Sequence, residues 1–141
     1  MASTTTTGTP PAARTSRRSL TIRGCRSQVA RARAFVARTL GPEHPGTEVA
    51  VLLTSELVTN AVLHSNSRDG GGPVTVVVVA RLGGWLRIEV SDAGSACSAP
   101  VVKKDVCASS GHGLFLVDAL AQEWGYSRGE SRTTVWFSLA A

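Results

Sequence analysis

Two valine-rich segments joined by a pair of glycines constrain the possible folds of this chain more than any other feature. They lie within VTVVVVARLGGWLRIEVSD, residues 74–92, and the turn between them contains Gly83 and Gly84. β-branched residues favour strands, and glycines adopt the backbone angles that a tight hairpin turn requires. The sequence therefore predicts two antiparallel strands here.

Periodicity and helix breakers place the remaining elements along the chain. They predict, in order, a short strand over 19–24, a helix over 27–40 with Ser27 as its N-cap, a break at 41–46, a second helix over about 48–65 capped by Thr47, a loop over 93–110, a helix that opens at the glycines of 111–113, and a hairpin within 124–140. A loop of that length is typical of a lid or a binding loop.

The order of these elements predicts an α+β fold, a two-layer sandwich in which a mixed, mostly antiparallel sheet is covered on one face by helices. The length of 141 residues fits one domain. We expect a disordered Ser/Thr/Arg-rich tail over 1–18 and a folded domain over 19–141. The tail lacks the apolar segment of a secretory signal, although an organellar transit peptide would share its acid-free composition.

Apolar stretches, cysteines and histidines exclude several classes of protein. The longest apolar run is only strand-length, whereas a membrane span needs about 18 residues. Cys25, Cys97 and Cys107 form no CxxC motif and cannot all pair, which favours a reduced cytoplasm. The three histidines are too far apart for a zinc site, so a structural metal is not expected.

The positive charge is confined to one end of the chain. The net charge is +5, yet residues 1–40 hold eight arginines and no acid, whereas residues 41–141 hold seven basic and ten acidic residues, a net charge of −3. Such an arm could bind nucleic acid. Because no aromatic residue precedes Phe35, the arm offers no base-stacking platform. A solvated tail leading into a basic helix face is therefore favoured, with DNA binding kept as an alternative.

The second helix places two polar residues inside an apolar arc. On a wheel of 100° per residue, Glu56 and Asn60 lie within about 20° of Val49, and three leucines lie within about 60°. A second apolar stripe lies on the opposite side. An ionised carboxylate in an apolar setting is costly without a partner. The pair indicates either a site that lines a cavity or polar side chains that satisfy buried backbone groups.

Two glycine-containing motifs follow downstream. VSDAGS ends a strand with Asp92 and Gly94, where the carboxylate could accept a hydrogen bond from a ligand amine or could only make a turn. SSGHGLFLV opens a helix at Gly111 and Gly113, whose N–H groups suit a phosphate or serve only as a cap. Without GK[ST], this is not a Walker loop. Each motif alone is ambiguous.

Taken together, the order of the motifs is specific. E-x-x-x-N on a helix, D-x-G after a strand, a long loop and G-x-G at a helix start resemble the histidine-kinase/gyrase/heat-shock-chaperone ATPase family, whose ATP-binding domain has the Bergerat fold. SELVTNAVLHS (55–65) and the terminal TTVWFSL are similar in particular to the small bacterial anti-sigma-factor serine/threonine kinases. The resemblance covers residues from about 20 to 139.

This resemblance implies a role for each motif residue. Asn60 would ligate the Mg²⁺ of bound ATP, and Glu56 would be the general base that takes a proton from a serine hydroxyl or from water. Asp92 would accept a hydrogen bond from the adenine amino group, with Gly94 keeping the backbone clear of the ring and Thr134 lying under the base. The remaining nucleotide contacts would come from Gly111, His112, Gly113 and Leu114.

The resemblance also implies partners and a location. The protein would be cytoplasmic, with ATP and Mg²⁺ as cofactors, and would bind a sigma factor in one state and an anti-anti-sigma protein, its phosphorylation substrate, in another. Relatives often dimerise through the first strand and helix, where Leu20, Ile22 and Phe35 lie. A membrane partner is not expected.

The sequence departs from the family pattern at two places. Ser95 follows the D-x-G motif where a further glycine is common, and Ser109 and Ser110 stand where many relatives carry an acidic residue and an arginine. Because of these departures, the motifs support ATP binding better than they support turnover. A catalytically weak or inactive ATP-binding module that sequesters a partner protein is therefore the alternative.

Overall fold

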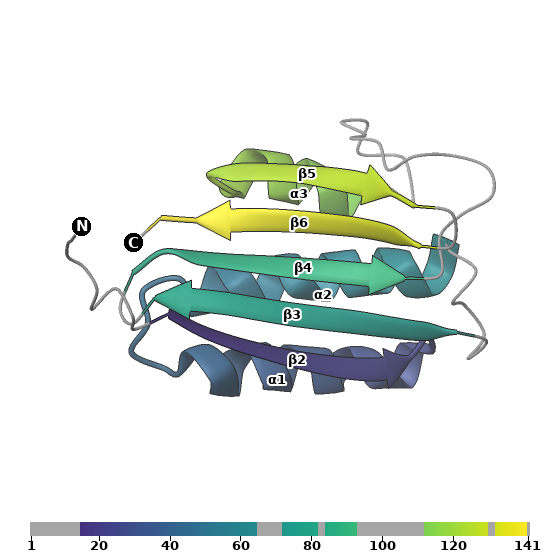
Figure 1. Ribbon diagram of the computed structural model, residues 1–141, viewed down its shortest axis with the longest axis horizontal. Helices are drawn as coiled ribbons and strands as arrows, with labels where there is room; N and C mark the ends of the chain where they lie inside the picture. The colour runs from purple at the N-terminus through teal and green to yellow at the C-terminus, as the bar shows by residue number, and fades with distance from the viewer. Residues whose placement is uncertain (1–14, 65–71, 82–83, 93–111, 130–131, 141) are drawn as a thin grey trace, which may run out of the picture.

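The computed structural model describes residues 15–64, 72–81, 84–92, 112–129 and 132–140. One five-stranded sheet, in the order β2-β3-β4-β6-β5, carries helices on one of its faces (Figure 1). Along the chain, the elements are β2 (Thr15–Arg23), the 3₁₀ helix η2 (Arg26–Gln28), α1 (Val29–Leu40), α2 (Thr47–His64), β3 (Pro73–Arg81), β4 (Leu86–Asp92), α3 (His112–Leu120), β5 (Glu123–Arg128) and β6 (Thr133–Leu139). Among the described helices, none is long and apolar enough to cross a membrane.

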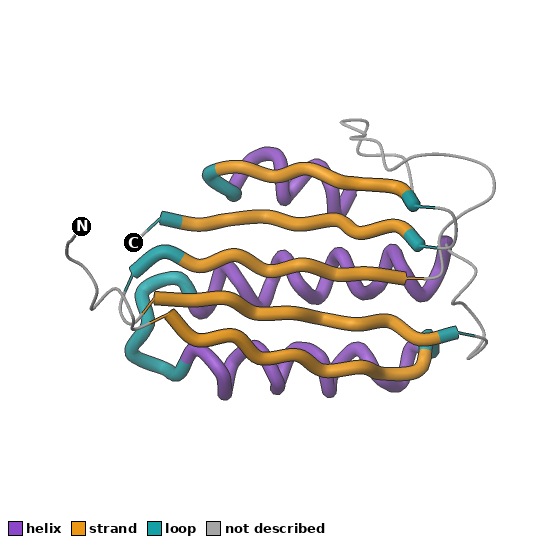
Figure 2. The backbone as a smooth tube through the Cα atoms, in the orientation of Figure 1, coloured by secondary structure: helices purple, strands orange, loops and turns teal. Residues whose placement is uncertain are grey.

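The sheet confirms the predicted α+β sandwich but corrects one detail. The predicted hairpin of 74–92 is the antiparallel pair β3–β4, and the last hairpin is β5–β6. The helices form the second layer (Figure 2). Because β2–β3 and β4–β6 are antiparallel as well, every strand pair in the described part of the chain is antiparallel, and the expected mixed character is absent there.

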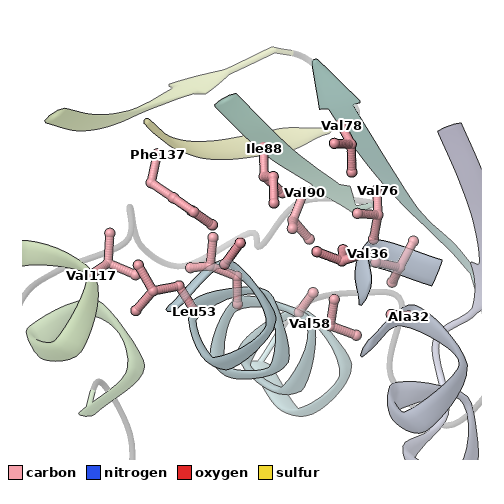
Figure 3. Close-up of a cluster of buried hydrophobic side chains, with 14 of the residues drawn as sticks. Ala32, Val36, Leu53, Val58, Val76, Val78, Ile88, Val90, Val117 and Phe137 are labelled. Atoms are coloured by element: carbon pink, nitrogen blue, oxygen red, sulfur yellow. The ribbon is translucent and has the colours of Figure 1, made fainter. Parts of the chain in front are cut away.

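The core lies between the sheet and the helices. Alternate residues of the three central strands are buried on the helix-covered face, namely Val74, Val76, Val78, Ala80, Leu86, Ile88, Val90, Phe137 and Leu139. α2 lies under this face between α1 and α3, and contributes Leu53 and Val58 to the cluster (Figure 3). Val36 of α1 and Val117 of α3 complete it. The sheet and all three α-helices thus share one core.

The side chains expected at a dimer contact belong to this core. Ile22 is only 3% exposed, and Leu20 and Phe35 are partly buried against the same cluster. Their apolar character is thus explained within one chain. A homodimer stays a prediction.

Two boundaries at the N-terminal side differ from the sequence-based expectation. β2 pairs with the whole length of β3, starting with Thr15 opposite Arg81, so the strand begins four residues before the predicted 19–24. The rest of the predicted tail, residues 1–14, lies outside the described residues. α1 begins at Val29 after a 3₁₀ turn, so the prediction of Ser27 as its N-cap is wrong. The Ser27 hydroxyl instead lies 3.3 Å from the Cys25 sulfur.

The predicted break at 41–46 is confirmed, with a different use for Thr47. Gly41 ends α1 with a φ of +83° and donates its N–H to the carbonyl of Ala37. The Thr47 hydroxyl donates to the Gly41 carbonyl at 2.6 Å, so it ties the two helices together and does not act as the predicted cap. α2 begins at Thr47 itself. His44 is buried in this connection and accepts the Gly46 N–H at Nδ1.

A buried hydroxyl on α2 gives a test of this packing. Thr54 is fully buried, and its Oγ1 has no hydrogen-bond partner. Because burying an unsatisfied hydroxyl is costly, we expect Thr54→Val to raise the free energy of unfolding by about 1 kcal/mol in urea titrations. Thr59→Val, on the half-exposed side of the same helix, is the control and should change it by less than about 0.5 kcal/mol. A loss of stability in Thr54→Val would contradict the burial of α2.

Candidate functional site

The side of α2 that carries Glu56 and Asn60 is the side turned away from the core. Its core side consists of the buried residues Ala50, Leu53, Leu57, Val58, Ala61 and Val62. Glu56 and Asn60 are half-buried, and Leu52 on the same arc is 41% exposed. The cost of burying an isolated carboxylate is thus avoided, because Glu56 keeps contact with solvent. The two polar groups lie one helical turn apart on this side of the helix.

Asp92 lies at the end of β4, on the helix-covered face of the sheet. It continues the alternation that buries Leu86, Ile88 and Val90, and it is itself half-buried. Its register partner on the neighbouring strand β6 is Thr133, which is 7% exposed. Adjacent strands lie about 4.8 Å apart, so a carboxylate and a hydroxyl meet side by side on this face.

Thr134, predicted to lie under a bound base, is on the other face of the sheet. Its Oγ1 is 2.8 Å from the Oγ of Ser91, its register partner on β4. Successive residues of a strand point to opposite faces, so Thr134 faces away from Asp92 and from the helices. The structure therefore places Thr133, not Thr134, beside Asp92.

The signal for Thr133 was present in the sequence. In TTVWFSL, Val135, Phe137 and Leu139 alternate with Trp136 and Ser138, and the apolar set belongs to the core. Counting back in steps of two from Val135 places Thr133 on the same face as this apolar set. Thr134, the threonine predicted to contact the base, is one residue out of step with this core-facing set.

Four segments of the candidate site lie toward the same side of the molecule. The end of β4, the start of β6, the start of α3 and the last turns of α2 all lie at the right in Figure 1. His112, Gly113 and Leu114 form the first turn of α3. The backbone N–H groups of a first helical turn lack partners within the helix and favour an anion. Gly94 and Gly111 lie outside the described residues.

The opposite face of the sheet has contacts of its own. The guanidinium of Arg87 lies 4.2 Å from the ring centroid of Trp136, and its Nε is 3.0 Å from Glu89. A Cβ at Gly125 would approach the Trp136 ring to 3.0 Å, so a larger residue there would crowd the indole. Thr134 therefore belongs to the open face of the sheet, where neighbouring side chains contact one another.

Comparisons with known proteins fit this arrangement. The family model described as histidine kinase-like ATPase domain matches residues 24–139. The structure of the RsbU and RsbW domains of Rv1364c from Mycobacterium tuberculosis is similar, with a TM-score of 0.66 and 23% identity over 88% of this chain and 31% of that chain. At that identity the likeness shows the fold alone, and this chain spans less than a third of the other. A comparison with curated proteins found no match.

A second structure is more distant. The histidine kinase domain of the blue-light activated histidine kinase from Erythrobacter litoralis EL346 has a TM-score of 0.48 and 22% identity, over 80% of this chain and 59% of that chain. A TM-score below 0.5 carries no weight beside the family match. The family match spans most of the chain and both strands that bring Asp92 and Thr133 together. This chain belongs to the histidine kinase-like ATPase domain family.

Proposed function

We propose that this protein is an ATP-binding regulator, an anti-sigma factor that phosphorylates a serine or threonine of an anti-anti-sigma partner. Membership of the ATPase family supports ATP binding. The likeness of SELVTNAVLHS to small anti-sigma-factor kinases supports the finer assignment. The observation that carries the proposal is the pairing of Asp92 with Thr133 at the end of the sheet that also meets α2 and α3.

Asp92 and Thr133 are suited to hold the adenine ring. An ionised carboxylate accepts hydrogen bonds and does not donate them, so Asp92 selects for the amino group that adenine carries. The neighbouring hydroxyl can both donate and accept, and it can orient the carboxylate or share a water with the ring. A base without that amino group would lack this hydrogen bond, which lowers its binding energy. Gly94 would clear space for the ring.

Asn60 and the start of α3 are suited to the triphosphate. Mg²⁺ prefers oxygen ligands and is usually held by one or two protein oxygens together with phosphates and waters. Within the described residues, no group of three His, Cys, Asp or Glu side chains could hold a metal. Bound Mg²⁺ would neutralise phosphate charge. The Asn60 amide oxygen would ligate it, and Gly111, His112, Gly113 and Leu114 would offer backbone N–H groups to phosphate.

Glu56 is the candidate general base. It lies one helical turn before Asn60 and keeps part of its surface exposed to solvent, which a substrate hydroxyl could approach. Phosphoryl transfer depends mainly on positioning and charge neutralisation, and one carboxylate that accepts the hydroxyl proton completes the set. The general base Glu56 and the metal ligand Asn60 lie on α2, and Asp92 and Thr133, the proposed adenine contacts, lie on β4 and β6.

The two adjacent threonines test the nucleotide site directly. Thr133→Val should weaken the binding of ATP in the presence of Mg²⁺ about tenfold in calorimetric titrations, because a polar partner of Asp92 is lost. Thr134→Val removes the same atoms on the opposite face and should change the affinity less than about twofold. The reverse order of effects would place the nucleotide on the open face and contradict the site.

Asn60 should decide the dependence on metal. We expect Asn60→Ala to lose most of the gain in ATP affinity that Mg²⁺ produces in the wild type, because the amide ligand is missing. Affinity measured in excess chelator should stay near the wild-type value, within about twofold. An unchanged response to Mg²⁺ in Asn60→Ala would remove Asn60 from the metal site.

Glu56 should separate binding from transfer. Glu56→Gln should bind Mg-ATP within about threefold of the wild type and lose phosphate transfer to the partner by a factor of about 100 or more. Radiolabel transfer from ATP to the anti-anti-sigma protein is the measurement, and Glu48→Gln, at the exposed start of the same helix, is the control. Equal transfer by wild type and Glu56→Gln would overturn the assignment of the base.

A further inference from the structure

The edge strand β5 carries an arginine on the helix-covered face of the sheet. The Trp124 indole of β5 donates a hydrogen bond to the Asp118 carboxylate of α3 at 2.9 Å, so Trp124 faces the helices. Alternate residues of a strand share a face, so Tyr126 and Arg128 lie on that side as well. Arg128 is the last residue of the strand and is exposed.

The strand register aligns this arginine with the two proposed adenine contacts. Arg128 is the register partner of Thr133 on β6, and Thr133 is in turn the partner of Asp92 on β4. The three residues therefore form one row across three adjacent strands, which lie about 4.8 Å apart. At the end of the row opposite Asp92, Arg128 offers a group that only donates hydrogen bonds.

The start of α3 lies close to the same position along β5. The two elements are in contact and run in opposite directions, because a connection of two residues joins them (Figure 1). From the bond between Trp124 and Asp118, β5 advances about 13 Å to reach Arg128. α3 extends only about 9 Å in that direction before it begins at His112. Arg128 is therefore level with the space just in front of the first turn of α3.

Few other cations are available on the elements around this space. Neither α2 nor α3 contains a lysine or an arginine. β4, β5 and β6 contain two arginines and no lysine, and one of the two, Arg87, stacks on Trp136 on the open face of the sheet. Within these five described elements, Arg128 is therefore the one permanent cation on the helix-covered face.

The chemistry of the guanidinium favours phosphate over the adenine amino group as its partner. Arginine has no acceptor atom, so it cannot pair with the amino group that Asp92 would bind. Its planar fork donates two parallel hydrogen bonds to the oxygens of a phosphate. The free N–H groups at the start of α3 favour an anion in the same space. Two independent features of the fold thus attract negative charge to one place.

We propose that Arg128 is a phosphate-binding residue of the nucleotide site, with its guanidinium paired to the phosphate oxygens that lie in front of α3. This inference rests on the proposed function, because it assigns Arg128 to the phosphates of the bound nucleotide. It adds to that function a residue on the edge strand of the sheet that holds the triphosphate end of ATP and leaves the adenine end to Asp92 and Thr133.

Two arginines of one hairpin test the proposal. Arg128→Gln should weaken the binding of Mg-ATP about tenfold in calorimetric titrations, because a charged pair to phosphate is lost. Arg132→Gln is the matched control. The Arg132 carbonyl accepts the Gly129 N–H at the β5–β6 turn, and strand alternation places Arg132 on the face of Thr134. This control should change the affinity less than about twofold.

A comparison of ATP with adenosine separates phosphate contacts from ring contacts. Arg128→Gln should leave the affinity for adenosine within about twofold of the wild type, whereas Asp92→Ala should weaken adenosine and ATP by the same factor. Shifts of amide resonances report the adenosine affinity, even where the dissociation constant is millimolar.

Two further measurements test the role of charge. Arg128→Lys keeps the charge without the fork, so its affinity for Mg-ATP should lie between those of the wild type and Arg128→Gln. Both Arg128 and Arg132 are exposed, so the unfolding temperatures of their variants without nucleotide should match that of the wild type.

The contrary outcomes are distinct. Binding of Mg-ATP by Arg128→Gln as tight as by the wild type would overturn the assignment and leave the proposed function intact. An equal loss of ATP and adenosine in Arg128→Gln would also overturn it, because Arg128 would then act on the ring or through Asp92. A wild-type protein that binds no ATP would contradict the proposed function, and the role of Arg128 would fall with it.

Discussion

The packing of α2 beneath the sheet is the constraint on which the rest of the structure depends. One side of this helix, with Leu53, Leu57 and Val58, is buried among side chains of the sheet and of both neighbouring helices. Burial of that side is favourable by roughly 25 cal/mol for each Å² of apolar surface removed from water, and it fixes the rotation of the helix about its axis. Glu56 and Asn60 are half-exposed as a direct consequence.

The same constraint separates the molecule into surfaces with different chemistry. The end of the sheet next to α2 and α3 carries a carboxylate and a hydroxyl on adjacent strands, which suits a nucleotide. The open face of the sheet is occupied by its own pairs, with Arg87 stacked on Trp136. The basic flank, formed by β2, η2 and α1, carries seven exposed arginines.

The sequence predicted well the features that depend on periodicity and breakers. The β3–β4 hairpin, the break after Leu40 and helix α2 followed from local patterns, because valines, glycines and apolar spacing act over a few residues. The start of β2 did not follow, since its first residues form a strand only by pairing with β3. Register is a long-range property, and it decided the choice between Thr133 and Thr134.

Local chemistry also misled at two helix starts. Ser27 and Thr47 are residues that favour N-caps, yet the structure uses Ser27 in a 3₁₀ turn and Thr47 as a donor to the Gly41 carbonyl. Backbone N–H groups near both positions already have backbone partners, since Gln28 donates to the Cys25 carbonyl and Ala50 donates to the Gly46 carbonyl. The two side chains therefore form other contacts. The N-cap propensity of serine and threonine therefore indicated two residues with a structural role, Ser27 and Thr47, but did not predict which hydrogen bonds they make.

The most direct test of the account is a map of backbone amide resonances during titration with a non-hydrolysable ATP analogue and Mg²⁺. The account predicts that the amides of Asn60, Asp92 and Thr133 shift together with those at the start of α3, while those of Arg31, Arg87 and Trp136 stay in place. Shifts confined to the basic flank or to the open face of the sheet, with none at Asp92 and Thr133, would contradict it.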